Sequence, residues 1–409
     1  MNAKQAKYPQ LRFKGFTDPW VQRNLADLSD GFSYGLNAAA KEYDGVHGYL
    51  RITDIDEVSH SFLPEGLTSP DVPEDQLTDY RMDEQSIVYA RTGASTGKTY
   101  IYRDSDGELY YAGFLIRQKV NKETSAQFVY QNTLTKAWER YVQVMSQRSG
   151  QPGINAQEVG RFELAIPEKA EQDKIAHLFN SLDNLIAANQ RKLDLLKEQK
   201  KGYLQKMFPK NGAKVPELRF AGFADAWEER KLSSGLREYT DRVIVEDDKE
   251  YSQISVRNNF GGITLRGSKM GNKIGRKRQA KINLTKYPQT LIFTRQTVEQ
   301  GGIGWVDKYC DAAIVTENMP TISLDTSVFS KYFLTNLFQT RIFYKNAILD
   351  NVEGGSAQIA IHESKFLSST LLFPNLDEQE KLGKFFKQLD KTIALHQRKL
   401  EKLQELKKG

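Results

Sequence analysis

The chain of 409 residues has few of the residues that build covalent or metal-centred sites. Its single cysteine, Cys310, excludes a disulfide framework and a zinc cluster within one chain. The five histidines show no metal-ligand spacing, so we expect no metal site. No apolar run approaches the ~18 residues of a membrane span, and residues 1–10 contain no apolar signal segment. These absences predict a soluble, cytoplasmic protein.

The composition is that of a globular protein with a small excess of positive charge. Hydrophobic residues make up 39% and charged residues 27%, which argues against disorder. The length exceeds one ordinary core, so we expect two domains. The net charge of +6 is compatible with a polyanionic partner, although its distribution matters more than its sum.

The sequence contains an internal repeat with an offset of 207 residues. Ten of twenty positions are identical between 9–28 and 216–235, and eighteen of 37 between 166–202 and 373–409. The centres between them, 29–165 and 236–372, have little in common. Drift of a duplicated domain would erode ends and centres alike. The contrast therefore favours a shared scaffold that carries two different recognition tasks.

Two long helices are predicted to begin at Pro167 and Pro374, because proline is tolerated in the first helical turn. Their apolar residues follow the 3,4 spacing of a coiled coil. A polar residue at the same position of each seam, Asn189 or His396, is typical of a register-fixing position. The alternative is two unrelated amphipathic helices, each packed on its own domain. The predicted seam residues are Phe179, Leu182, Ile186, Asn189, Leu193, Leu196, Phe386, Leu389, Ile393, His396, Leu400 and Leu403.

Connectivity makes the predicted helix pair antiparallel. The first helix spans ~60 Å at 1.5 Å per residue, and the linker after it reaches at most ~28 Å. The second domain must therefore sit near the end of the first helix, and the second helix must run back. The predicted segments are domain one (1–166), central helix (167–208), linker (209–216), domain two (217–373) and C-terminal helix (374–409).

The predicted fold class is α+β. It consists of two α/β target-recognition domains in tandem repeat, separated by two long helices that form an antiparallel coiled coil, a dumbbell with pseudo-two-fold symmetry. Strand-like segments and one helix recur in the same order in both centres, which suggests that the fold was kept while surface loops changed. In the first centre they are 48–56, 86–91, 115–120 and the helix 128–147; in the second they are 251–257, 290–295, 312–315 and the helix 328–345.

The second centre contains the stronger charge signal. From Tyr251 to Val298 there are ten Lys or Arg and no Asp or Glu. Clustered cations bind phosphates by releasing counterions, and interspersed glycines allow the backbone close approach. We interpret the segment as a DNA-phosphate contact; a solvated basic loop or an RNA contact is the alternative. The predicted DNA-contact residues are Lys269, Lys273, Arg276, Lys277, Arg278 and Lys281.

The first centre has no equivalent basic segment. Residues 40–85 are acidic, and we expect that face to point away from DNA. Its better candidates follow the second predicted strand, and Arg295 and Gln296 are their predicted counterparts in the second copy. These first-centre candidates are Arg91, Thr92, Ser95, Thr96 and Lys98.

No catalytic residue is predicted. The segment Thr92–Thr99 resembles a Walker A loop, but threonine replaces its first glycine, and the second copy has no lysine there. No paired-carboxylate nuclease pattern lies outside the seam helices, and no Asn-Pro-Pro or Asp-Pro-Pro methyltransferase motif is present. The sequence therefore predicts binding without chemistry.

These features together resemble the specificity subunit of type I restriction–modification systems over essentially the whole chain. The resemblance rests on Leu-Arg-Phe-x-Gly-Phe at 11–16 and 218–223, each followed by a tryptophan. It also rests on Tyr-Leu-Arg-Ile-Thr-Asp-Ile at 49–55 and on the Glu-Gln pairs after Pro167 and Pro374. Each pattern is weak alone, but their order in two copies is specific.

The resemblance implies that each domain reads one half of a split double-stranded DNA site, while the helices set the gap. It also implies that the helices dock two modification subunits, which carry S-adenosylmethionine and methylate adenine, and that restriction subunits bring ATP and magnesium. This chain would then bind no cofactor and be no enzyme itself. The competing hypotheses are a helical scaffold that reads no DNA sequence, and a stand-alone nuclease or methyltransferase.

Overall fold

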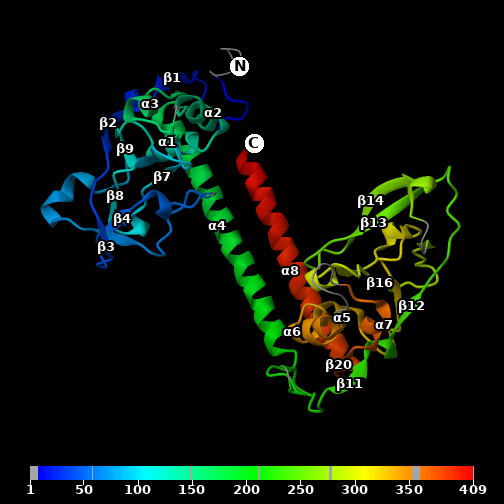
Figure 1. Ribbon diagram of the computed structural model, residues 1–409. Helices are drawn as coiled ribbons and strands as arrows, with labels where there is room; N and C mark the ends of the chain where they lie inside the picture. The colour runs from blue at the N-terminus through cyan, green and yellow to red at the C-terminus, as the bar shows by residue number, and fades with distance from the viewer. Residues whose placement is uncertain are drawn as a thin grey trace. The chain divides into compact units, whose positions relative to one another are not determined.

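The structure is a computed structural model that describes residues 8–57, 59–147, 150–210, 212–275, 279–351 and 360–408, the last without its side chain. The chain forms two compact units (Figure 1). The first contains residues 1–187 and 405–409, and the second contains residues 188–404. Within the described residues, no helix is both long enough and apolar enough to cross a membrane.

The first unit is built on a four-stranded antiparallel sheet with the order β2-β9-β6-β7. The central strand β6 is buried at every position. Three short helices contribute apolar residues to the core beside it. The elements are β2 (Ser29–Tyr34), β6 (Ser86–Ala90), β7 (Thr99–Ile101), β9 (Leu115–Val120), α1 (Ala126–Asn132), α2 (Lys136–Met145) and α3 (Ala156–Gly160). Smaller sheets pair β1 (Val21–Asn24) with β10 (Glu163–Ile166), β3 (Ala40–Glu42) with β5 (Thr68–Pro70), and β4 (Gly48–Leu50) with β8 (Leu109–Tyr111).

The second unit repeats this plan. Its main sheet has the order β12-β19-β16-β17, strand for strand the order of the first unit. A second sheet, with the order β14-β13-β18-β15, has no counterpart of its size among the described residues of the first unit. The main-sheet strands and helices are β12 (Leu236–Tyr239), β16 (Thr290–Phe293), β17 (Ile303–Trp305), β19 (Thr321–Leu324), α5 (Lys331–Leu337), α6 (Arg341–Phe343) and α7 (Glu363–Ser368). The remaining strands are β11 (Glu228–Lys231), β13 (Glu250–Val256), β14 (Ile263–Met270), β15 (Ala280–Lys281), β18 (Ile314–Val315) and β20 (Thr370–Phe373).

Two strand predictions were only partly confirmed. The strand predicted over 48–56 ends at Leu50, because Asp54 accepts hydrogen bonds from the backbone and guanidinium of Arg51 and closes a 3-10 turn. The segment 312–315 forms only β18, which lies in the second sheet. The true counterpart of β9 is β19, whose Thr-Ile-Ser-Leu sequence is less apolar than the run that suggested a strand.

Both predicted single helices are interrupted at a threonine. The Thr135 hydroxyl accepts the Trp138 amide and starts α2 after α1 has ended, and Thr340 does the same for Phe343 at α6. A threonine side chain that bonds the backbone competes with helix continuation and favours a cap. After α6 the chain continues as a π-helical turn, Tyr344–Ile348.

The long helices are α4 (Lys169–Lys206) and α8 (Leu376–Lys408), which begin two residues after their prolines. All twelve predicted seam residues are buried or half-buried, with Leu193 and Leu400 among the most buried. Leucines at other helical positions, such as Leu185 and Leu395, are about half exposed. The heptad pattern therefore identifies the inward face of each helix.

Contacts inside each unit show how the helices meet. In the second unit Lys200 pairs with Asp390 at 2.8 Å, and Tyr203 lies edge-on to Phe385 with ring centroids 5.1 Å apart. Later residues of α4 thus contact earlier residues of α8, so these segments run antiparallel. In the first unit Asp183 pairs with Lys407 at 2.6 Å. The two ion pairs join residues that correspond through the 207-residue offset.

A buried ion pair fixes each domain to its own long helix. Arg12 donates two hydrogen bonds of 2.8 Å to Glu171, and Arg219 donates two of 2.7 Å to Glu378. Both carboxylates are buried and are held in the first turns of α4 and α8. Bidentate arginine–carboxylate pairs restrict orientation as well as distance. The arginine of each Leu-Arg-Phe motif and the glutamate of each Glu-Gln pair are therefore architectural.

The glutamines of the same Glu-Gln pairs are also buried. Gln172 accepts the Ser125 amide and donates to the Pro167 carbonyl, and Gln379 does the same with Ser330 and Pro374. Each glutamine thus connects the start of a long helix to the N-terminus of α1 or α5. Helix N-termini leave amides without intrahelical partners, and these side chains satisfy one of them.

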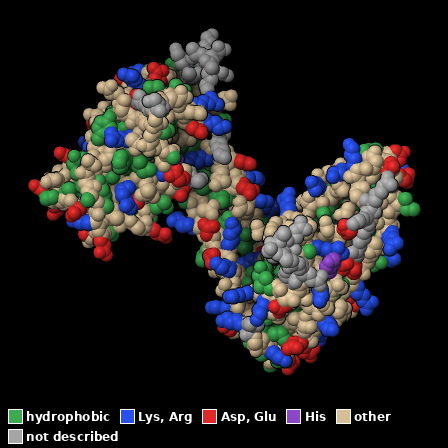
Figure 2. Space-filling model, in the orientation of Figure 1, with side chains coloured by type: hydrophobic (Ala, Val, Ile, Leu, Met, Phe, Trp, Pro, Cys, Tyr) green, Lys and Arg blue, Asp and Glu red, His purple; other side chains and the backbone are tan. Residues whose placement is uncertain are grey.

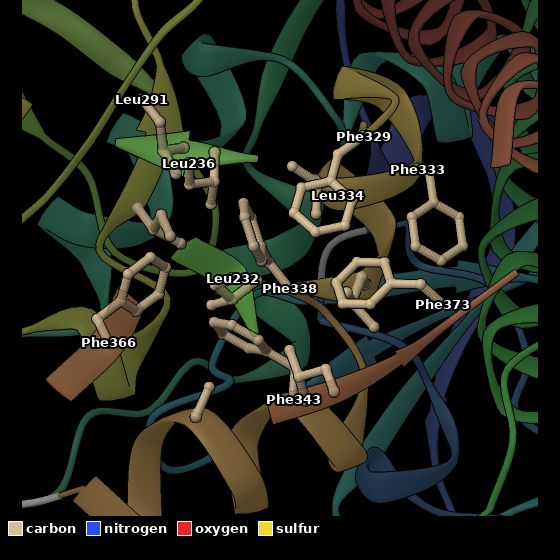
Figure 3. Close-up of a cluster of buried hydrophobic side chains, with 14 of the residues drawn as sticks. Leu232, Leu236, Leu291, Phe329, Phe333, Leu334, Phe338, Phe343, Phe366 and Phe373 are labelled. Atoms are coloured by element: carbon tan, nitrogen blue, oxygen red, sulfur yellow. The ribbon is translucent and has the colours of Figure 1, made fainter. Parts of the chain in front are cut away.

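Aromatic rings dominate the core of the second unit. Figure 3 shows Phe329, Phe333, Phe338, Phe343, Phe366 and Phe373 gathered around Leu232, Leu236, Leu291 and Leu334. Phe208 after α4 and Phe386 of α8 join the same cluster. The helix ends are thus part of the domain core rather than appended to it.

We expect Arg219→Ala to lower the free energy of unfolding by about 2–3 kcal/mol, because it leaves the buried Glu378 carboxylate without its partner. Urea unfolding followed by tryptophan fluorescence would measure this, since Trp227 lies in the adjoining core. The control is Arg230→Ala, whose partner Glu228 is exposed, and which should cost at most about 1 kcal/mol. Equal effects of the two substitutions would contradict the role assigned to the Arg219–Glu378 ion pair. We call this pair and its equivalent Arg12–Glu171 the clamps.

Candidate nucleic-acid interface

The acid-free basic segment forms an exposed two-stranded ribbon. Strands β13 and β14 pair antiparallel over their whole length, and β14 is the edge strand of its sheet. Ile254 and Ile263 anchor the ribbon in an apolar cluster, whereas every residue from Leu265 to Met270 is exposed. Lys and Arg side chains lie on the part of the second unit around these strands, together with Asp and Glu side chains near its tip (Figure 2). A strand exposed on both faces contributes little to a core. The shape of the ribbon is therefore maintained by the pairing of its own two strands.

The ribbon contains a bulge at its centre. Gln253 pairs with Gly267 and Ile254 pairs with Leu265, which leaves Arg266 as the extra residue. Gly267 has a φ of +121°, in the region that favours glycine. Bulges bend a strand locally and re-aim a side chain.

Four cations in the ribbon and the turns next to it have no acidic partner among the described residues. Arg257, Arg266, Lys269 and Lys273 are exposed, and none of them makes an ion pair with a described residue. Lys281, in contrast, lies 4.0 Å from Asp241. The predicted contacts Arg276, Lys277 and Arg278 lie outside the described residues.

The ribbon's turn, residues 257–262, is fixed to the loop that follows β16. The Asn259 and Phe260 amides donate to the carbonyls of Gln300 and Gly301 at 2.7 and 3.0 Å. The Asn258 side chain donates to Gln300 Oε1 at 2.7 Å. The fold thus brings together the two parts of the second centre that the sequence predicted as DNA contacts, the basic segment and the Arg295 loop.

The loops after β6 and β16 are structurally equivalent, as predicted. Arg91 accepts the Ile154 amide through its carbonyl at 2.9 Å, and Arg295 accepts the Ile361 amide at 3.0 Å. Their side chains nevertheless differ in surroundings. Arg295 donates to Glu363 at 2.6 and 2.9 Å, and both side chains are largely buried. Its neighbour Gln296 is exposed.

Arg91 has no carboxylate partner among the described residues. Its guanidinium lies over the Tyr34 ring, 5.1 Å from the centroid, and its Nε is buried without a hydrogen bond. Tyr34 is itself placed by the Ala156 amide, which donates to its hydroxyl at the start of α3. The charge of Arg91 is therefore oriented but not neutralised.

The other predicted residues of this loop are used to hold its shape. Thr92 forms a β-bridge with Gly153, Thr96 donates to the Gly93 carbonyl, and Ser95 donates to Glu57. The Lys98 ammonium is buried and donates to the Ile52 and Ile55 carbonyls and to Glu57. The hydrogen bond from Lys98 is the main cause that lowers the pKa of Glu57. A phosphate could reach Lys98 only by displacing these contacts.

A cleft of about 930 Å³ adjoins Tyr34 in the first unit. Tyr80, Tyr102 and Tyr111 line it together with acidic side chains, Asp79, Asp83, Glu84 and Asp104. The acidic lining agrees with the acidic character predicted for residues 40–85. One acid of this segment, Asp54, is instead buried in its ion pair with Arg51.

No catalytic arrangement is apparent in the described part of the chain. No group of three or more His, Cys, Asp or Glu side chains there is placed to hold a metal ion. Cys310 is buried, and burial raises the pKa of its thiol. The candidate interface is made of cations, amides and aromatic rings.

Comparison with known proteins decides the family. The model of the type I restriction modification DNA specificity domain matches residues 36–198 and again 246–405. The chain belongs to this family of type I restriction–modification specificity subunits. The MjaVIII specificity subunit of Methanocaldococcus jannaschii is 22% identical over 90% of this chain and 85% of its own length. A chain described as the MjaX specificity subunit of the same organism is 19% identical over 99% and 95%.

The fold has a counterpart among solved structures. The type I restriction–modification S subunit of M. genitalium covers 98% of this chain and 96% of its own, with a TM-score of 0.61 and 12% identity. At this identity the similarity concerns the fold alone. It agrees with the mixed α and β content and the two specificity domains predicted from the sequence.

Sequence reasoning overlooked several residues of this specificity subunit, some in or under the candidate interface and two in the ion pairs that join the domains to their long helices. Arg257 and Arg266 lie in the basic segment but were not singled out, although the absence of nearby acids was a usable signal. Tyr34 gave no signal, because only the fold brings it under Arg91. Arg12 and Arg219 were noted as motif letters without their buried partners.

We expect Arg295 to contribute to stability and its equivalent Arg91 to contribute to DNA binding. Arg295→Ala should lower the free energy of unfolding by about 1.5–3 kcal/mol, because it removes hydrogen bonds to the charged Glu363. Arg91→Ala should leave stability within about 0.5 kcal/mol and weaken DNA binding instead. Urea unfolding and DNA titrations on both variants would test this. A stability loss at Arg91 equal to that at Arg295 would contradict the distinction.

Proposed function

We propose that this specificity subunit reads a split double-stranded DNA site, with one half-site assigned to each target-recognition domain. The main observation in its support is that the two domains share one structural frame but present different surfaces. The main sheets have the same strand order and the clamps are equivalent, yet one centre presents the β13–β14 ribbon and the other the Arg91 loop beside an acidic cleft. A frame that is kept while its surfaces differ suits two readers of different sequences.

The proposed DNA contacts are the predicted or neighbouring cations that have no acidic partner among the described residues. Lys269 and Lys273 remain in it with Arg257 and Arg266, and Arg91 is the candidate of the first domain. We leave Lys98 and Arg295 out, because their charges are engaged inside the domains. Thr92, Ser95 and Thr96 then act by holding the Arg91 loop in shape.

We further propose that α4 and α8 form an antiparallel coiled coil that sets the gap between the half-sites. The buried or half-buried seam and the two offset-related ion pairs, Lys200–Asp390 and Asp183–Lys407, support this. A helix of 38 residues measures ~57 Å at 1.5 Å per residue. Half-sites one DNA turn apart lie about 34–36 Å from each other. The helix is thus long enough to hold two readers at such a spacing.

The chemistry is proposed to reside on partner subunits. Two methyltransferase subunits would dock on the helices and bring S-adenosylmethionine, and restriction subunits would bring ATP and magnesium. This chain would direct them without turnover of its own. The exposed leucines of α4 and α8, Leu178, Leu185, Leu195 and Leu395, offer apolar contacts for such docking.

The competing hypothesis is a helical scaffold without sequence-specific reading. Both hypotheses predict protein partners, but only a reader prefers one split sequence over competitor DNA at fixed salt concentration. The acid-free segment 251–298, with Arg257, Arg266, Lys269 and Lys273 exposed and without a described acidic partner, favours the reader, since a scaffold has no need of it.

We expect deletion of this gene in its host to abolish adenine methylation at one bipartite motif and at no other sequence. Methylation mapping with and without the gene would measure this. Restoring the gene with Lys269→Ala and Lys273→Ala together should lower methylation at the same motif, because two phosphate contacts are lost. An unchanged methylation pattern after deletion would refute the proposed function.

We expect removal of one matched heptad from each helix, residues 190–196 and 397–403, to shorten the gap by about 3 base pairs. Seven residues correspond to ~10 Å of helix, and DNA rises about 34–36 Å per turn of 10–10.5 base pairs. The deletion keeps the seam phase and the residues of both ion pairs. Methylation mapping would show the new motif, with Lys192→Gln, an exposed residue of the deleted heptad outside the seam and the proposed docking leucines, as a full-length control. Altered half-site sequences would contradict the proposal that the domains read the half-sites while the helices set only the gap.

A further inference from the structure

The β13–β14 ribbon ends in a long edge strand that is exposed over most of its length. Six consecutive residues of β14, Leu265 to Met270, are exposed, although they alternate between both faces of the sheet. An edge strand usually buries one face or is covered, because its unpaired amides and carbonyls invite other chains. A polar, two-sided ribbon that the fold leaves uncovered therefore needs an explanation in terms of a ligand.

We infer that the β13–β14 ribbon enters the major groove of the second half-site and that Arg266 reads a base there. This inference rests on the proposed function and adds to it the reading element and its specificity-determining residue. The major groove, ~12 Å wide, admits a two-stranded ribbon, since paired strands lie about 4.7–4.9 Å apart. The minor groove, ~6 Å wide, does not.

The side chains beside the bulge are small enough for close approach. Gly267 pairs with Gln253, and Ser268 pairs with Ser252. One face of the ribbon around them presents Gln253, Thr264 and Ser255, which are hydrogen-bonding residues without bulk. Amide and hydroxyl groups of this kind recognise base edges, glutamine chiefly those of adenine.

Charge along the ribbon is polarised. Arg257 follows β13, Arg266 lies at the bulge, and Lys269 pairs across from Tyr251, which places three cations over ~20 Å at about 3.3 Å per residue. That distance equals about six base pairs of rise at 3.4 Å each. At the far end, Glu250 and the acidic residues 246–248 lie near Lys269 and Lys273 and weaken the attraction of phosphates there. We therefore place the base contact in the middle of the ribbon and assign only phosphate contacts to its far end.

The bulge gives Arg266 its role. An extra residue in a strand is re-aimed relative to its neighbours, and this one has a guanidinium with no described acidic or hydrogen-bonding partner. A free planar guanidinium pairs bidentately with guanine O6 and N7 in the major groove. Lys269, a point charge on a flexible stem, suits a phosphate instead.

Hydrogen bonds within the second unit fix the position of the ribbon without a ligand. Its turn is hydrogen-bonded to Gln300 and Gly301, and the Tyr309 hydroxyl donates to the Ile263 carbonyl at 2.9 Å. Asn259 and Phe260 adopt positive φ values of 53° and 57° within this turn. Residues in such strained conformations persist where the surroundings over-determine them, often at ligand sites. Reading therefore requires little ordering of the ribbon.

The test uses the full-length chain with its co-purified methyltransferase subunits and selection from a split random-sequence DNA library. Four variants are compared with the wild type: Arg266→Ala, Arg266→Lys, Lys269→Ala and the control Lys231→Ala on β11, an exposed cation outside the basic segment. Thermal unfolding of each variant checks that it folds. DNA with 7-deazaguanine removes the N7 acceptor of the major groove, and DNA with inosine removes the minor-groove amino group of guanine.

We expect Arg266→Ala and Arg266→Lys to relax one base position of one half-site about 5- to 150-fold, the discrimination of one bidentate contact. Lysine keeps the charge, so its salt dependence should stay near that of the wild type. Lys269→Ala should weaken all sequences alike and lower the salt slope by about 1. 7-Deazaguanine at the relaxed position should weaken the wild type and not the Arg266 variants, and inosine should have no such effect.

The outcomes separate this inference from the proposed function. If both Arg266 variants keep every base preference, or if inosine rather than 7-deazaguanine weakens binding, the ribbon does not read the major groove and the inference fails while split-site reading stands. If the wild type selects no split sequence, the proposed function itself fails. If Arg266→Ala unfolds, the test rests on Arg266→Lys. Loss of base preference in that variant at unchanged stability supports the inference, and unchanged base preference refutes it.

Discussion

The organisation of this specificity subunit depends on two buried ion pairs, Arg12–Glu171 and Arg219–Glu378. Each joins the opening motif of a repeat to the first turns of the long helix that ends it. The carboxylates are excluded from water, so neither can lose its guanidinium without a large cost. Because the pair is bidentate, it also fixes the angle at which the helix leaves the domain. Any function that needs a defined spacing between readers depends on that angle.

Around the clamps, polar side chains repeat the same solution twice. Gln172 and Gln379 cap the helix that follows the main sheet, and Thr135 and Thr340 interrupt that helix at equivalent places. The apolar residues beside them differ freely, as in the phenylalanine-rich core of the second unit. Hydrogen bonds of fixed geometry preserve the frame, while hydrophobic packing tolerates replacement by residues of similar volume.

Patterns with a defined period or offset were predictable from the sequence. The offset of 207 located the frame, and the 3,4 spacing identified inward residues such as Leu193 and Leu400. The counterpart of β9 was missed because Thr-Ile-Ser-Leu is a weak strand signal that only pairing with β12 and β16 stabilises. Lys98 and Arg295 were predicted at the surface because a sequence does not show which carbonyls or carboxylates the fold brings beside a cation. The equivalence of the Arg91 and Arg295 loops was predictable, since it follows from chain order.

The bulged strand β14 has a consequence for the chain before it meets any ligand. A free strand edge offers unpaired amides and carbonyls to a second copy of itself, which is the usual beginning of self-association. Arg266 and Lys269 place like charges on that edge, and the bulge interrupts the regular spacing of its hydrogen-bonding groups. The side chains that we propose as contacts to a polyanion thus also disfavour edge-to-edge pairing of two such chains.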